Sequence, residues 1–214
     1  MKIGIDCGHT KTGSDYGSRG VLRDESYLTR EVGVRVANKL KALGHTVINC
    51  YKDNCSSLGD SLSYRVTQAN NNNVDLFISI HFNAFNSQAH GTEVWTYGGK
   101  HFTEADRVLN NLVALGYKNR GIKNGSDLYV LRNTKSKAML IECCFCDNKA
   151  DMDIYNAEKI SDAIVKGITS KLPEKLKPKD NLYKVQVGAF KDKNNAENLK
   201  ESLKRKGYEG FITE

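Results

Sequence analysis

The chain has 214 residues, 39% of them hydrophobic and 27% charged, and a formal net charge of +7. This length and composition are typical of one globular domain with a small appendage. The longest uncharged apolar run, near Leu76–Ile80, is far shorter than the roughly 20 residues of a transmembrane helix, so we expect no membrane insertion. Lysine and arginine are dispersed, with no block comparable to a DNA-reading surface, so we expect no nucleic-acid partner. The mild positive charge fits loose attraction to any polyanion and does not by itself choose among anionic lipid, wall polymers and nucleic acid.

Apolar runs and helical periodicities alternate along the chain, and the alternation predicts a definite architecture. In order, we predict a strand over Lys2–Ile5, a glycine-rich loop over Gly13–Gly20, a helix from Ser26 that ends at Gly44, strand Thr46–Cys50, helix Ser61–Ala69, strand Val74–Ile80, strand Glu93–Tyr97, helix Thr103–Leu115, strands Asp127–Leu131 and Ala138–Cys143, and helix Ala157–Lys171. Strands that alternate with helices indicate an α/β fold: an open, mostly parallel twisted sheet with helices on both faces.

The residues from 172 to the end of the sequence have a different character. Pro173 and Pro178 flank a lysine-rich stretch, which predicts a linker over residues 172–180. Beyond it, the pattern predicts a small β-α-β appendage, with a strand, a helix and a strand over Leu182–Ala189, Asn194–Lys206 and Tyr208–Thr213. An appendage of this size has too small a core to fold comfortably by itself.

Four side chains that suit metal chemistry flank the predicted strands. His9 and His81 follow apolar strands, Glu142 closes another, and Glu25 stands just before the first helix. Because functional sites of parallel α/β sheets form outside the carboxyl ends of the strands, we expect these four to converge. Three nitrogen and oxygen ligands leave zinc an open position, and a free carboxylate beside it can carry protons.

Each of these residues also has an ordinary explanation. A histidine after a strand is often a loop residue whose ring bonds the backbone, and a glutamate at a helix start complements the helix dipole. Glu142 is harder to explain in this way, because a carboxylate at the end of an apolar strand is costly to bury without compensation. We expect the cysteines of the Cys143–Cys146 segment to be reduced thiols that pack in a buried strand. The alternative is that Cys143 is a nucleophile.

An ordered series of segments carries a family resemblance. The segments are Asp6-Cys7-Gly8-His9, Asp24-Glu25, Arg65–Asn70, Ile78–Ala84, Gly91–Val94, Asn119-Arg120-Gly121, Tyr129–Arg132, Leu140-Ile141-Glu142 and Phe145–Asn148. Over residues 1–171 the chain resembles the zinc-dependent N-acetylmuramoyl-L-alanine amidases of the amidase-3 type, which occur in bacterial autolysins and phage endolysins. One departure is Thr10, where the family often has glycine, which affects the expected loop shape.

The resemblance implies that His9, Glu25 and His81 bind one catalytic Zn²⁺ and that Glu142 is the catalytic residue. The implied reaction is hydrolysis of the amide bond between N-acetylmuramic acid and L-alanine in peptidoglycan, which lyses bacterial cells. Asn83 and Arg132 are expected to contact substrate, or else to cap strand ends. Alternatives are a zinc peptidase that cuts within the stem peptide and a non-catalytic wall-binding protein.

Residues 181–214 resemble the first half of a SPOR domain, a peptidoglycan-binding module, through Tyr183–Phe190, Asn195–Glu197 and Lys206–Tyr208. We expect this half to pair with a second copy in a homodimer, to pack on the catalytic domain, or to be vestigial.

The first residues, Met1–Asp6, lack the apolar core of a secretory signal. We therefore expect a cytoplasmic protein that reaches the wall after release, as an endolysin does through a holin or an autolysin after lysis of the mother cell.

Overall fold

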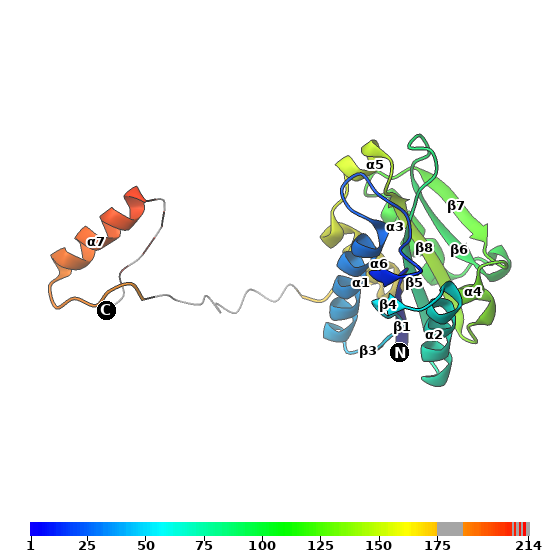
Figure 1. Ribbon diagram of the computed structural model, residues 1–214. Coiled ribbons are helices and arrows are strands. Elements are labelled where there is room, and N and C mark those ends of the chain that lie inside the picture. Colours follow the sequence, from blue (N-terminus) through cyan, green and yellow to red (C-terminus); the bar gives the residue numbers. More distant parts are fainter. Residues whose placement is uncertain (175–185, 207, 209, 211, 213–214) are drawn as a thin grey trace. The chain divides into compact units, whose positions relative to one another are not determined.

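The computed structural model describes residues 1–174, 186–206, 208, 210 and 212 (Figure 1). The chain divides into two compact units, Met1–Glu174 and Lys175–Glu214, and each is described by itself. In the part of the chain that is described, no helix has both the length and the apolar character needed to cross a lipid bilayer.

The first unit is built on a six-stranded sheet in the order β3-β1-β5-β8-β6-β7. β1, β3, β5 and β8 are parallel, β6 pairs antiparallel with β8, and β7 is parallel to β6. The mostly parallel sheet is therefore confirmed. The strands of this sheet are β1 Lys2–Cys7, β3 Thr46–Asn49, β5 Leu76–Asn83, β6 Thr92–Thr96, β7 Asn119–Asn124 and β8 Lys137–Phe145; the short β2 Thr12–Gly13 and β4 Asn54–Cys55 pair separately.

Helices cover both faces of this sheet, as predicted (Figure 1). One face is covered by α1 (Glu25–Ala42), α3 (Thr103–Val113) and α6 (Ala157–Thr169), and the other by α2 (Leu58–Asn71) and α4 (Tyr129–Asn133). The first unit also contains the short helices η1 (Tyr97–Gly99) and α5 (Lys149–Asp153).

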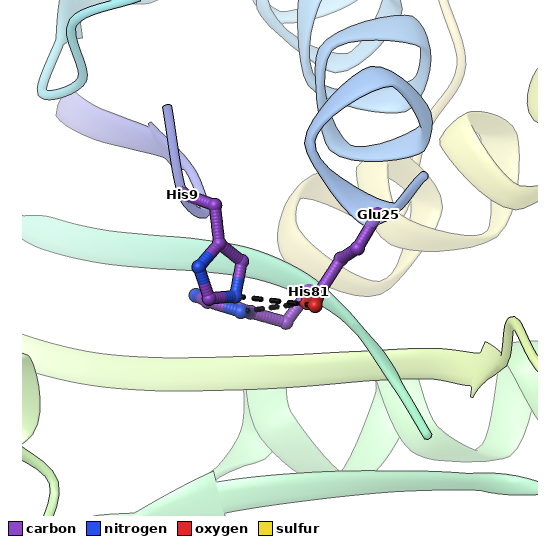
Figure 2. Close-up of side chains that lie close together, drawn as sticks. All are labelled: His9, Glu25 and His81. Atoms are coloured by element: carbon purple, nitrogen blue, oxygen red, sulfur yellow. Dashed lines mark hydrogen bonds and ion pairs between the residues drawn. The ribbon is translucent and has the colours of Figure 1, made fainter. Parts of the chain in front are cut away.

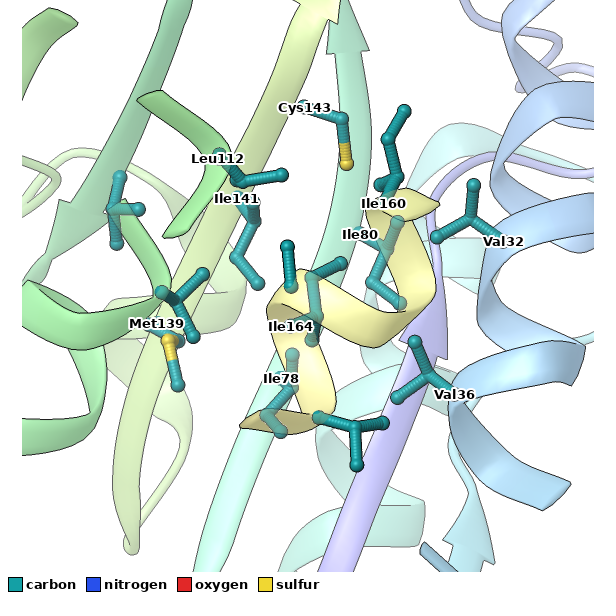
Figure 3. Packing of buried hydrophobic residues seen from close by; sticks show 14 of the residues in the cluster. Val32, Val36, Ile78, Ile80, Leu112, Met139, Ile141, Cys143, Ile160 and Ile164 are labelled. Carbon is teal, nitrogen blue, oxygen red and sulfur yellow. The ribbon is translucent and has the colours of Figure 1, made fainter. Parts of the chain in front are cut away.

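The central strands are apolar because both of their faces are buried. In β5, Ile78 and Ile80 point into the larger core under α1, α3 and α6, whereas Phe77 points into the smaller core under α2 and α4 (Figure 3). In β8, Met139 and Ile141 belong to the larger core in the same way. Side chains alternate between the two faces of a strand. Near the carboxyl ends of β5 and β8, the positions on the face covered by α2 are therefore available for polar groups.

The direction of β6 follows from the length of the connection before it. The chain leaves β5 at Asn83 and enters β6 at Thr92, and the eight residues between them are too few for the crossover that a parallel strand needs. β6 therefore begins at the edge of the sheet where β5 ends. Its first residues, Thr92 and Glu93, lie beside the carboxyl end of β8.

The predicted strand over Asp127–Leu131 is wrong. These residues lead into α4, whose buried Val130 and Leu131 pack in the smaller core with α2. The strand of this region comes earlier, as β7, and its sequence, Asn-Arg-Gly-Ile-Lys-Asn, has no apolar run because β7 is an edge strand with half-buried side chains. Residues 119–124 therefore lack the continuous apolar run by which a strand buried on both faces is recognised in a sequence.

In the second unit, the predicted helix over Asn194–Lys206 is confirmed as α7, Lys193–Arg205. The side chain of Asp192 caps α7 by accepting a hydrogen bond from the Asn194 backbone N–H at 2.8 Å, and no residue of α7 is buried. The predicted strands over Leu182–Ala189 and Tyr208–Thr213 lie partly outside the described residues, and residues 186–189 form no strand.

Candidate metal centre

The structure brings together the three expected metal ligands from three separate elements (Figure 2). His9 lies just beyond β1, Glu25 is the first residue of α1, and His81 lies near the end of β5. One nitrogen from each imidazole and one carboxylate oxygen all lie within 4.8 Å of one another. Two imidazoles and a carboxylate at this spacing form a donor set for Zn²⁺ that leaves a coordination position open.

The Glu25 carboxylate lies between the two rings. Its Oε2 is 3.2 Å from His9 Nε2 and accepts a hydrogen bond from the Ser18 backbone N–H at 2.9 Å. Its Oε1 lies 3.0 Å from His81 Nδ1 and accepts a hydrogen bond from the Phe82 backbone N–H, also at 3.0 Å. Both carboxylate oxygens are thus fixed in direction by the backbone as well as by the imidazoles.

Glycines make room for this cluster at two points. A Cβ on Gly8 would lie 2.3 Å from both Cε1 and Nε2 of His81, so only glycine allows the backbone just after β1 to pass the ring this closely. Gly17 has a φ of +75°, and its Cβ would lie 2.6 Å from His9 Cδ2 and 2.7 Å from Glu25 Oε2. Thr10, by contrast, has no positive φ; it is buried, and its hydroxyl donates to the Asp15 carbonyl at 3.0 Å. The loop thus accommodates threonine at this position.

The pKa values of the two histidines are shifted in opposite directions. Burial lowers the pKa of His9, but its hydrogen bonds to Asp15 and Glu25 outweigh burial and raise that pKa to about 9. Burial dominates at His81 and lowers its pKa, although Glu25 opposes the effect. Burial alone would raise the pKa of Glu25, yet the hydrogen bonds and charges of His81 and His9 hold it below its ordinary range. The carboxylate is therefore ionised and available as a ligand.

Glu142, the expected proton carrier, lies beside the ligands. It is the Cα partner of His81 across β5 and β8, and of Glu93 across β6 and β8, so the three side chains share one face of the sheet. Its Oε2 is buried without a hydrogen-bond partner among the described residues. Burial raises the pKa of Glu142 well above its ordinary value, and the negative charges of Glu25 and Glu93 raise it further.

The neighbouring Glu93, which the sequence did not single out, is a buried carboxylate that is fully paired. It accepts a hydrogen bond from Arg120 Nε at 2.8 Å and from Asn83 Nδ2 at 3.0 Å. Asn83, expected at the substrate, thus lies next to the cluster and contacts Glu93. Arg132, expected with it, lies in the last turn of α4 with an exposed side chain, and among the described residues no hydrogen bond or ion pair joins it to His9, Glu25 or His81.

The cysteine-rich segment belongs to the core and not to the site. Cys143 is fully buried and points into the larger core, on the face of β8 opposite to Glu142 (Figure 3). Burial, followed by the charges of Glu142 and Glu25, raises the pKa of this thiol well above its ordinary value. A thiol held in its neutral form among apolar side chains is a poor nucleophile.

The residues present fit a zinc ion. Two nitrogen donors and one oxygen donor converge, their directions are fixed by hydrogen bonds, and the unpartnered Glu142 oxygen lies beside them. Residues 3–173 match the family model of N-acetylmuramoyl-L-alanine amidase. The chain belongs to this amidase family. The match covers the whole sheet and both helical layers, so the family resemblance of the sequence is confirmed.

The chain is similar to curated proteins of two bacterial genera. An uncharacterised protein of Clostridium perfringens is 38% identical over 181 residues, which cover 82% of this chain and 52% of that protein. The sporulation-specific N-acetylmuramoyl-L-alanine amidase of Bacillus subtilis is 28% identical over 218 residues, which cover 99% of this chain and 84% of that one. The chain spans about half the length of the two Clostridium perfringens relatives that it matches.

Among solved structures, the catalytic domain of the CD27L endolysin targeting Clostridia difficile superposes with a TM-score of 0.71 and 33% identity, and the match covers 80% of this chain and 98% of that domain. A SPOR domain model matches residues 157–214 and thus overlaps the amidase match. The overlap contains α6, whose Ile160, Ile164 and Ile168 are buried in the larger core of the sheet. Helix α6 is therefore structurally part of the amidase fold.

Proposed function

We propose that this chain is a zinc-dependent hydrolase that cuts the amide bond between N-acetylmuramic acid and L-alanine in peptidoglycan. The observation that carries the proposal is the buried, unpartnered Oε2 of Glu142 beside the His9, Glu25 and His81 cluster. Membership in the amidase family supports the choice of bond. The names of the Bacillus subtilis relative and of the endolysin domain support the same substrate class.

In this mechanism the first task of the protein is to hold and orient the ion. His9 Nε2, His81 Nδ1 and a Glu25 oxygen are the atoms that face one another, and they would hold the ion. A bound Zn²⁺ supplies Lewis-acid polarisation of the scissile carbonyl and a more acidic water. The backbone N–H groups of Ser18 and Phe82 keep the Glu25 carboxylate in place during this step.

Glu142 performs the proton transfers. Its carboxylate takes the proton of the attacking water and then delivers it to the departing nitrogen of L-alanine, which must be protonated to leave. The raised pKa of this carboxyl, caused by burial and by two neighbouring carboxylates, suits a group that must both accept and return a proton. Its partly exposed position lets it reach substrate.

The experiment that tests this proposal is a digest of purified cell walls. We expect the chain to release stem peptides with a new L-alanine amino terminus, detected by mass spectrometry, and we expect EDTA to stop the release and added Zn²⁺ to restore it. New termini at any other residue would instead establish the zinc peptidase. Wall binding without new termini would establish the non-catalytic binder.

We further propose that residues 1–171 form the catalytic domain and that residues 172–180 link it to the C-terminal segment. We propose that this segment, residues 181–214, binds wall glycan and pairs with a second copy in a homodimer. The SPOR match and the absence of any buried residue in α7 support a partner for this segment. Sedimentation of the full chain with insoluble walls, compared with a chain that ends at residue 171, tests glycan binding. Analytical ultracentrifugation of the same two proteins tests the dimer.

We also propose that the protein acts at the cell wall, causes lysis, and reaches the wall from the cytoplasm. The endolysin structure supports release through a holin, and the sporulation-specific relative supports release on mother-cell lysis. Fractionation of producing cells before and after lysis, with detection of the full chain, distinguishes a cytoplasmic store from continuous export.

A further inference from the structure

His9 has a backbone conformation that needs external support. Its φ is +65°, in the left-handed region, which a non-glycine residue adopts at a cost. Arg30 of α1 supplies part of the support: its guanidinium donates to the carbonyls of Cys7 at 2.6 Å, Gly8 at 3.0 Å and His9 at 2.7 Å. The loop that carries the first ligand is thus fixed through its backbone by a buried arginine.

The imidazole of His9 is fixed separately, through its second nitrogen. His9 Nδ1 donates to Asp15 Oδ1 at 2.6 Å, which leaves Nε2 directed at Glu25 and the metal position. Asp15 is only 6% exposed, and it lies in the glycine-rich loop between two of the ligands. A ring nitrogen that donates to a carboxylate in this way fixes the tautomer and the orientation of a metal-binding histidine.

Asp15 is itself fixed from the sheet and from α2. Its other oxygen, Oδ2, accepts a hydrogen bond from Arg65 Nη2 at 2.6 Å, and the same nitrogen donates to Ser61 at 3.0 Å. Arg65 Nε lies 3.6 Å from Asp6 Oδ1 in β1, and Arg65 is 2% exposed. The chain of contacts runs from the sheet through Arg65 and Asp15 to the ring of His9, and Arg65 is distant in sequence from the other three residues.

We propose that Asp15 is the positioning residue of the metal centre, and that Arg65 holds Asp15 in the geometry that keeps His9 Nε2 directed at the ion. The proposal rests on the proposed function, in that the ion to be held is zinc. Neither Arg65 nor Asp15 belongs to the ligand set or contacts Glu142, so both act on the ion through His9. Outer partners of this kind change metal affinity by about 10- to 100-fold when they are removed.

The experiment measures the Zn²⁺ dissociation constant of the purified full chain by competition with a chromophoric chelator, together with the melting temperature of the metal-free protein. We expect D15A to weaken zinc binding by about 10- to 100-fold. We expect D15N to weaken binding less, because its amide oxygen can still accept from His9 Nδ1 while the charge is lost. We expect R65K to weaken binding also, because lysine keeps the charge but its single nitrogen cannot hold both Asp15, which Arg65 contacts through Nη2, and Asp6, which lies beside Nε.

The matched control is D162N. It removes a carboxylate that accepts from Lys39 Nζ at 2.6 Å, an ion pair of the same length. Lys39 lies fourteen residues beyond Glu25 on α1, about 21 Å along the helix axis, so zinc affinity should remain that of the wild type.

D15A and D15N could bind zinc like the wild type while their metal-free melting temperatures fall. In that case the hydrogen bond between Asp15 and His9 only stabilises the fold of the loop, and the proposal is wrong. If the wild type itself binds no zinc, the proposed function fails, which is a separate and distinguishable result. D15N keeps the shape of the side chain, so it gives an answer even where D15A does not fold.

Discussion

The two sides of the metal centre treat their polar groups in opposite ways. On the ligand side, both Glu25 oxygens and the outer nitrogen of His9 are occupied by hydrogen bonds. On the acid side, Glu142 keeps a buried oxygen with no partner among the described residues, although its neighbour Glu93 is fully paired. Ligands must stay where they are, whereas a proton carrier must stay free to exchange its proton, and the difference in pairing follows from these two tasks.

Removal of a ligand should produce the largest effect. In H81A the cluster loses one of its two imidazoles and the carboxylate loses a partner at 3.0 Å. We expect the bound zinc, measured by elemental analysis, to fall from one ion per chain to almost none, and wall hydrolysis to fall with it. Retention of a full equivalent of zinc in H81A would remove this histidine from the ligand set. H101A, at an exposed imidazole, is the control and should retain its zinc.

Removal of the acid should separate chemistry from metal binding. In E142Q we expect zinc content to stay at the wild-type level while turnover on purified walls falls by a factor of about 10² or more, because glutamine cannot shuttle the proton. The measurement is the rate of appearance of L-alanine amino termini. Wild-type turnover in this variant would assign the proton transfers to another group.

The close approach of β1 to the ligand side gives a smaller, structural effect. In G8A the new methyl group would lie 2.3 Å from the His81 ring, whose Nδ1 is 3.0 Å from Glu25 Oε1. We expect a loss of about 1–3 kcal/mol in the free energy of unfolding, measured by urea denaturation, and weaker zinc binding.

The control for G8A is G59A in α2, where the added Cβ has no neighbour nearer than Ser57 Oγ at 3.9 Å. G59A should leave zinc binding unchanged and should stabilise the protein slightly, by about 0.5–1 kcal/mol. A G8A protein as stable as the wild type and with unchanged zinc affinity would show that the ring has room to move.

The smallest effect is expected where β8 faces the core instead of the site. In C143A we expect a loss of about 1 kcal/mol in the free energy of unfolding and unchanged wall hydrolysis, because the thiol only fills the core. Iodoacetamide should not inhibit the folded wild type. Inhibition by this reagent without inhibition by EDTA would reverse the assignment and make Cys143 the nucleophile. C50A, in the smaller core, is the matched control.

Several features of the fold could be read from local pattern, and others could not. The doubly buried run of β5 and the helical spacing of Leu28, Val32 and Val36 in α1 are apolar patterns that a few consecutive residues specify. The edge strand β7 has no such pattern, and the buried pair in α4 resembles a strand because a one-turn helix is too short to show its period. The antiparallel direction of β6 depended on the length of one loop.

The sequence by itself determined the strands and helices that have an apolar pattern, the residue types that can hold zinc, and the positions at strand ends where they gather, since all of these are encoded in short local patterns. Only the tertiary structure decided that Asp15 bonds His9, that Arg65 bonds Asp15, and that Glu93 lies beside Glu142. The physical reason is that the first of these contacts depends on how the loop between β1 and α1 folds back on itself, and the other two join different elements. Their meeting depends on how loops close and helices pack, which no single segment specifies.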